Sequence, residues 1–182
     1  MDPSEISEAR VVEMVAAIVK YMREERELYL PTSEALAAKW RSSVEQYFTR
    51  GFLDTIRTVE LPRGVRIPPP HFYAEAVALS GGNFPDFVHL ASVTYIDVIV
   101  FNETIKPRLL FHGLVHAQQF AILGLEPYTG LYLRAFLKAR AWTRIPLEEQ
   151  AFKLEERFMS APKKPFSVEE EIKLWAREGR YE

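Results

Sequence analysis

The sequence Phe111-His112-Gly113-Leu114-Val115-His116-Ala117-Gln118-Gln119-Phe120 decides the fold. It places two of the four histidines of the chain four residues apart, inside an apolar run of helical character. Residues i and i+4 of a helix lie on one face, so both imidazoles can reach a single point. Two nitrogen ligands in this arrangement suit a divalent transition metal ion. The segment therefore predicts a helix with two candidate metal ligands, His112 and His116.

Position 113 sets this segment apart from a familiar catalytic motif. Zinc peptidases use the same histidine spacing as His-Glu-x-x-His, where the glutamate is the general base. Gly113 occupies the glutamate position here and has no group that could accept a proton. Loss of a general base typically costs about two to four orders of magnitude in rate. A mid-helix glycine also costs about 1 kcal/mol relative to alanine, which suggests either a close approach by backbone or ligand, or drift after activity was lost.

Composition narrows the possible functions. The chain has 182 residues, of which 48% are hydrophobic and 26% charged, and its formal net charge is -2. No basic cluster indicates nucleic acid or an acidic membrane as a partner. The absence of cysteine excludes disulfides and thiolate metal sites, so any metal must rest on His, Asp or Glu. The sequence shows no basic-then-apolar leader and no apolar run of bilayer length, and we therefore expect a cytoplasmic protein without a membrane partner.

We expect a single α+β domain over residues 1–182, with several helices packed around a small β-sheet. Residues 1–50 form an N-terminal helical part. Residues 52–160 contain the sheet and the helices of the candidate site, and residues 165–180 form a C-terminal helix.

The N-terminal part predicts two helices. The first begins at an Asp2 cap and runs to about Leu28, before a proline. The second extends from about Thr32 to Phe48, because apolar side chains recur every fourth residue, and it ends at Gly51.

Strands are expected in the middle of the chain. Residues 56–61 alternate apolar and polar side chains as a half-buried strand does. Residues 95–102 are rich in β-branched side chains and predict a strand, whereas residues 88–94 predict a strand or a connecting segment. Residues 80–83 form a turn that lacks the features of a phosphate-binding loop.

Helical signals dominate the last part of the chain. Pro107 opens the histidine helix and Gly124 follows its end. A turn at Pro127 should precede a helix over residues 129–141, and a second turn over residues 143–146 leads to a helix over residues 147–158. A capping box beginning at Ser167 starts the final helix, which ends near Gly179.

Residues 110–120 resemble the HELVHVxQ segment of small bacterial zincin-like domains, which are related to gluzincin-type metallopeptidases. The likeness continues through Leu123-Gly124 and the aromatic residues that follow. Residues 146–152 are similar to a P-x-E-x-E-A segment of the same domains, although Gln150 replaces its second carboxylate. The likeness covers the middle third of the chain and implies a zincin-like fold with an HxxxH helix.

The resemblance implies that Glu148 is the third metal ligand, on a later helix that faces the histidine helix. Two imidazoles and one carboxylate leave one coordination position open, as in catalytic zinc sites. Glu149 is a weaker candidate, both as a ligand and as a general base. Gln119, one turn beyond His116, is expected to reach the same face.

Three functions follow from these features. The preferred one is a zincin-like metal-binding protein, a degenerate metallopeptidase without its general base, with zinc or another divalent ion as cofactor and a peptide or small molecule as ligand. In an active metal-dependent hydrolase, another carboxylate such as Glu149, Glu103 or Glu75 would replace the base. In a metal-free interaction domain, the paired histidines would only pack. His71 and His89 are expected to be structural or exposed, but either could supplement the site.

Overall fold

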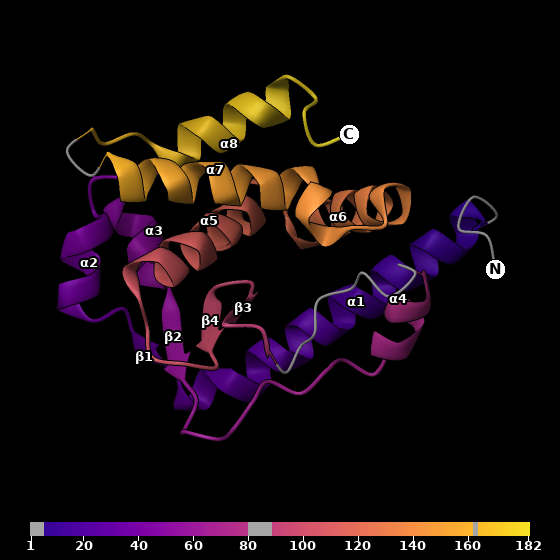
Figure 1. Cartoon of the computed structure of the whole chain (residues 1–182), viewed down its shortest axis with the longest axis horizontal. Coiled ribbons are helices and arrows are strands. Elements are labelled where there is room, and N and C mark those ends of the chain that lie inside the picture. The colour runs from indigo at the N-terminus through magenta and orange to yellow at the C-terminus, as the bar shows by residue number, and fades with distance from the viewer. Residues whose placement is uncertain (1–5, 80–88, 162–163) are drawn as a thin grey trace.

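A computed structural model describes residues 6–79, 89–161 and 164–182 (Figure 1). Within these ranges the chain is α+β, as the sequence predicts, with eight α-helices and a four-stranded mixed sheet. No helix in the described ranges is long and apolar enough to cross a bilayer. The helices are α1 (Glu8–Tyr29), α2 (Ala38–Val44), α3 (Arg50–Thr55), α4 (Tyr73–Leu79), α5 (Pro107–Leu123), α6 (Leu125–Ala139), α7 (Pro146–Ser160) and α8 (Val168–Arg177).

The sheet has the strand order β1-β2-β4-β3. Its strands are β1 (Glu34–Ala35), β2 (Arg57–Glu60), β3 (Ser92–Tyr95) and β4 (Val98–Phe101). The central pair β2 and β4 is parallel, while β1 and β3 pair antiparallel with their neighbours. Strand β3 therefore lies at an edge of the sheet.

The side chains of β4 point alternately into two separate parts of the hydrophobic core. Ile99 and Phe101 face the larger core, which includes α5, whereas Val98 and Val100 face a smaller core with Tyr21 of α1. Successive strand residues point to opposite faces, so a strand with apolar residues throughout is buried on both sides. All four residues of β4 are fully buried, which accounts for the continuous apolar run in the sequence.

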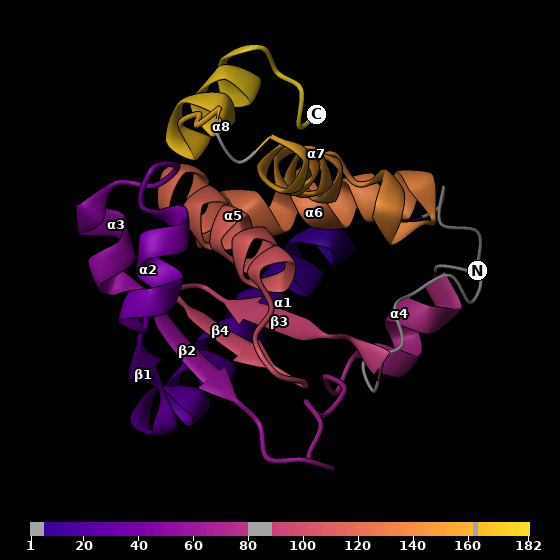
Figure 2. The ribbon, with the colours of Figure 1, turned by 60° about the vertical axis from the view of Figure 1, so that its left-hand side comes forward.

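Helix α5 runs through the centre of the fold, between the sheet and the pair α7 and α8 (Figure 2). Pro107 occupies its first turn, and Gly124 ends it with a φ of +84°, a conformation that favours glycine. Every residue from Gly113 to Phe120 is buried. The helix therefore carries few solvent-facing residues, and its polar members must find partners inside the protein.

Gly113 lies where α5 packs closely against the side chains of the sheet. A Cβ atom at this position would be 2.9 Å from Cγ2 of Ile99 and 3.2 Å from Oγ1 of Thr94. Of the two explanations for this glycine, the structure supports a close backbone approach. The Cβ atom of a glutamate at position 113 would make the same close contact, so the buried Ile99 side chain would have to shift to admit it.

The predicted second helix, from Thr32 to Phe48, is wrong at both ends. Glu34 and Ala35 instead pair with β2, so their backbone groups bond to the sheet edge. A short 3-10 turn (Leu30–Thr32) precedes them, and α2 begins only at Ala38 and ends at Val44. The predicted stop at Gly51 is also wrong, because Thr49 accepts a hydrogen bond from the Phe52 N–H and starts α3 ahead of this glycine.

The predicted long strand over residues 95–102 is interrupted. Ile96 has a φ of +63°, unusual for a β-branched residue, and the chain turns at Ile96 and Asp97 between β3 and β4. Both carboxylate oxygens of Asp97 accept hydrogen bonds from Arg26 of α1, at 2.5 and 2.8 Å. Strands β3 and β4 therefore form a hairpin, and its turn is hydrogen-bonded to helix α1.

The predicted turn at Pro127 is also wrong. Helix α6 begins at Leu125, directly after Gly124, and Pro127 lies in its first turn, where the backbone N–H groups have no partner within the helix. The predicted helices over α7 and α8 are confirmed, and Ser167 accepts a hydrogen bond from the Glu170 N–H. The predicted Asp2 cap and the turn at residues 80–83 lie outside the described residues. Ser7 caps α1.

We predict that Gly113→Ala destabilises the fold. Overpacking a well-packed core typically costs about 1–3 kcal/mol, which outweighs the gain of about 1 kcal/mol from replacing a helical glycine. Gly51→Ala is the matched control, because Gly51 is also helical but has no atom within 4 Å of the point that a Cβ atom would occupy. Urea unfolding should show a loss for Gly113→Ala and an unchanged or higher stability for Gly51→Ala. Equal stabilisation by both variants would contradict the close approach.

Candidate metal centre

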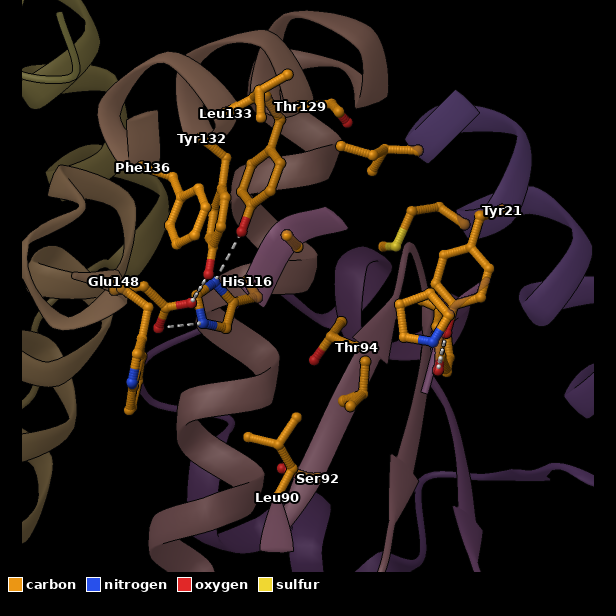
Figure 3. Close-up of a pocket in the computed structure, with 18 of the residues that line it drawn as sticks. Tyr21, Leu90, Ser92, Thr94, His116, Thr129, Tyr132, Leu133, Phe136 and Glu148 are labelled. Atoms are coloured by element: carbon orange, nitrogen blue, oxygen red, sulfur yellow. Dashed lines mark hydrogen bonds and ion pairs between the residues drawn. The ribbon is translucent and has the colours of Figure 1, made fainter. Parts of the chain in front are cut away.

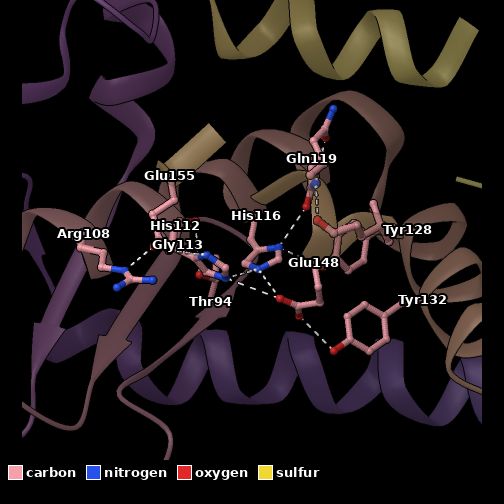
Figure 4. A network of polar contacts seen from close by, with 12 residues as sticks. Thr94, Arg108, His112, Gly113, His116, Gln119, Tyr128, Tyr132, Glu148 and Glu155 are labelled. Carbon is pink, nitrogen blue, oxygen red and sulfur yellow. Dashed lines mark hydrogen bonds and ion pairs between the residues drawn. The ribbon is translucent and has the colours of Figure 1, made fainter. Parts of the chain in front are cut away.

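The three predicted ligands converge. His112 and His116 project from α5, and Glu148 projects from the first turn of α7 (Figure 4). The two Nε2 atoms are 3.0 Å apart, and Oε2 of Glu148 lies 3.5 Å from Nε2 of His112 and 3.3 Å from Nε2 of His116. The expected convergence of these side chains is therefore confirmed.

The separations fit a divalent ion. A tetrahedral site with bonds of about 2.1 Å has ligand atoms about 3.4 Å apart, close to the observed 3.0–3.5 Å. In the part of the chain that the structure describes, these three residues are the group of His, Asp and Glu side chains that could hold an ion. Two imidazoles and a carboxylate also form the donor set of catalytic zinc sites.

The imidazole of His112 is oriented by a carboxylate behind it. Its Nδ1 lies 2.9 Å from Oε2 of Glu155, a buried residue of α7 that also pairs with Arg108. An ionised carboxylate only accepts, so Nδ1 donates and Nε2 is directed at the centre. Carboxylate–histidine pairs of this kind orient ligands in metal sites. The sequence did not indicate Glu155, although it lies one helical heptad after Glu148.

The imidazole of His116 is oriented by two glutamines. Its Nδ1 lies 2.9 Å from Oε1 of Gln119, whose Nε2 donates to the carbonyl oxygen of Leu147 at 3.0 Å and to Oε1 of Gln150 at 3.1 Å. These acceptors fix the amide, so Nδ1 of His116 must donate and its Nε2 lone pair is directed at the centre. Gln150 thus supports the orientation of His116 indirectly, through Gln119.

Two tyrosines of α6 complete the surroundings. The Tyr132 hydroxyl donates to Oε1 of Glu148 at 3.0 Å, which leaves Oε2 for the centre. The Tyr128 hydroxyl lies 3.2 Å from Nδ1 of His116. Burial, with the nearby Glu148 carboxylate, raises the pKa of both hydroxyls well above the usual range. Both therefore stay protonated near neutral pH, and neither can act as a base there.

Ionisation of the centre follows from its charges. Burial alone would lower the pKa of His112, but the carboxylates of Glu148 and Glu155 outweigh it and raise this pKa to about 9. Burial alone would raise the pKa of Glu148, but His116 and His112 hold it well below the usual range. Without an ion, His112 is therefore an imidazolium at neutral pH. Its Nε2–H then faces two hydrogen-bond acceptors, Nε2 of His116 and Oε2 of Glu148.

The centre opens onto a cavity of about 1060 Å³. Figure 3 shows Tyr132 and Phe136 of α6, Thr94 of β3 and Tyr21 of α1 around this space, with His116 and Glu148 on one wall. The side chains of His112, His116 and Glu148 are mostly buried at this wall, with 17%, 11% and 11% of their surface exposed.

The other carboxylates that the sequence offers as replacement bases form ion pairs with basic side chains. Glu149 is half-exposed and forms an ion pair with Lys153. Glu75 and Glu103 line the cavity, but they pair with Arg10 at 2.8 Å and with Lys106 at 2.6 Å.

Neither of the other two histidines belongs to the ligand group. His71 packs edge-on against Tyr21 and Phe72 on the cavity wall, and His89 is exposed. This placement agrees with the structural or exposed roles expected for them.

Comparison of the chain with known protein families, curated proteins and solved structures finds no match.

We predict that zinc binding at pH 7 releases about one proton per ion, because the ion replaces the proton that His112 holds below a pKa of about 9. The apparent affinity should accordingly rise with pH until about pH 9 and level off above it. Calorimetric titrations in buffers of different ionisation enthalpy measure the released proton directly. Zinc binding without proton release at pH 7 would show that His112 is neutral in the metal-free protein.

Proposed function

We propose that the protein binds one divalent metal ion, with zinc as the first choice, through His112, His116 and Glu148. We further propose that it is a zincin-like protein that has lost peptidase chemistry. The observation that carries the proposal is the convergence of three ligand atoms within 3.0–3.5 Å, on side chains that buried partners already orient.

The orienting contacts favour metal binding over simple packing. Each histidine uses Nδ1 for a hydrogen bond, to Glu155 or to Gln119, and directs Nε2 at the same point as Glu148. Burying a carboxylate and two imidazoles together is costly unless a cation or proton lies between them. The shared orientation toward one point supports metal binding over an interaction domain in which the histidines only pack.

The missing base argues against an active peptidase. When bound, zinc would supply Lewis-acid polarisation of a group at its open position. Proton transfer would still need a base, and Gly113 has no side chain to provide one. Glu155 is engaged by His112 and Arg108. The relocated-base hydrolase therefore remains the second candidate.

The proposal predicts about one zinc ion per chain, measured by equilibrium dialysis of untagged protein followed by elemental analysis. His116→Ala and Glu148→Ala should each lower the affinity by about 100-fold or more, because each removes a ligand. Glu149→Ala is the matched control and should bind like the natural protein, since this neighbour of Glu148 pairs with Lys153 on the surface. Equal binding by Glu148→Ala and Glu149→Ala would contradict the three-ligand site.

The same samples distinguish the two catalytic alternatives. Zinc-loaded protein should cleave generic peptides no faster than the metal-free protein. Robust cleavage that chelators suppress and His116→Ala abolishes would instead establish the hydrolase with a relocated base.

A further inference from the structure

The cavity beside the metal centre has a largely apolar wall. Apolar side chains come from helices α1, α4 and α6, from residues around β3, and from the segment around α7. The wall includes Met14, Ile18, Leu79, Val93, Leu133 and Phe152. Ligand pockets in proteins typically enclose about 300–1,000 Å³ and are mostly apolar, with a few polar groups that fix orientation. At about 1060 Å³, this space is large enough for an extended apolar chain.

The charged side chains on the wall form pairs. Arg10 bonds to Glu75 at 2.8 Å, joining α1 to α4, and Lys106 bonds to Glu103 at 2.6 Å. Arg108 pairs with Glu155. Arg10 also pairs with the exposed Glu13 at 3.0 Å. Each arginine and lysine of the wall is therefore engaged by a carboxylate, so the loaded metal centre would offer the strongest attraction for an anionic group inside the cavity.

The net charge of the metal centre determines whether an anionic or a cationic ligand is favoured. With a divalent ion, two neutral imidazoles and the Glu148 carboxylate, the centre would carry a net charge of about +1. The second carboxylate, Glu155, is balanced by Arg108. An anionic head group at the open position would therefore neutralise a buried cationic centre.

We propose that the cavity binds a single-chain aliphatic carboxylic acid, with the carboxylate at the metal centre and the hydrocarbon chain along the apolar wall. This proposal rests on the proposed metal function. A peptide fits less well, because each buried backbone N–H and C=O would need a partner. Strand β3 lies at a sheet edge but offers only the four residues Ser92–Tyr95.

Dodecanoate is the direct probe, with dodecanol as the uncharged control. Calorimetry on zinc-loaded protein should show dodecanoate binding at least about tenfold more tightly than dodecanol, and about tenfold more tightly than dodecanoate binds the metal-free protein. Along the series octanoate, decanoate and dodecanoate, affinity should rise about fourfold for each added CH₂ group that becomes buried.

Two neighbouring alanines on α1 give a matched pair of variants. Both are exposed, but Ala17 lines the cavity whereas Ala16 does not. Ala17→Trp should fill part of the cavity and weaken dodecanoate binding by about tenfold or more. Ala16→Trp should leave it unchanged, and both variants should keep one zinc ion per chain.

The outcomes separate this proposal from the one on which it rests. If zinc binds but dodecanoate binds no more tightly than dodecanol, or chain length has no effect, the metal site stands and the carboxylic acid proposal fails. If a blocked apolar peptide displaces dodecanoate at lower concentration than decanoate does, a peptide site replaces it. If zinc does not bind at all, both proposals fail.

Discussion

The close approach of α5 to the sheet at Gly113 is the contact on which the rest of the structure depends. A Cβ atom there would lie 2.9 Å from Cγ2 of Ile99, so glycine lets the central helix pack against the strands without displacing the Ile99 side chain. The same packing accounts for a glycine at the position after His112.

The other faces of α5 determine the site. His112 and His116 meet the first turn of α7, and their outer nitrogens bond to Glu155 and Gln119. Tyr132 holds the remaining oxygen of Glu148. Ligands restrained in this way lose little side-chain freedom when an ion arrives, which favours tight binding.

Local signals predicted much of this arrangement. The i,i+4 histidines, Pro107 and Gly124 defined α5 closely, and the likeness of residues 146–152 to a zincin-like segment identified Glu148. Long-range pairing produced one of the errors, since β1 replaced the start of a predicted helix because Glu34 and Ala35 pair with β2. The errors at Gly51 and Pro127 were local, because Thr49 caps α3 before the glycine and the first turn of α6 accepts the proline. The role of Glu155 was missed for a similar reason, since its partners Arg108 and His112 are more than forty positions away in the chain.

X-ray absorption spectroscopy of zinc-loaded, untagged protein tests the central claim most directly. A site built from His112, His116 and Glu148 predicts two imidazole nitrogens, identified by their outer-shell scattering, together with oxygen ligands at about 2.0–2.2 Å. The imidazole signal should fall by half in His112→Ala protein that still retains zinc. A spectrum with oxygen ligands alone, or one that is unchanged by His112→Ala, would contradict the proposed centre.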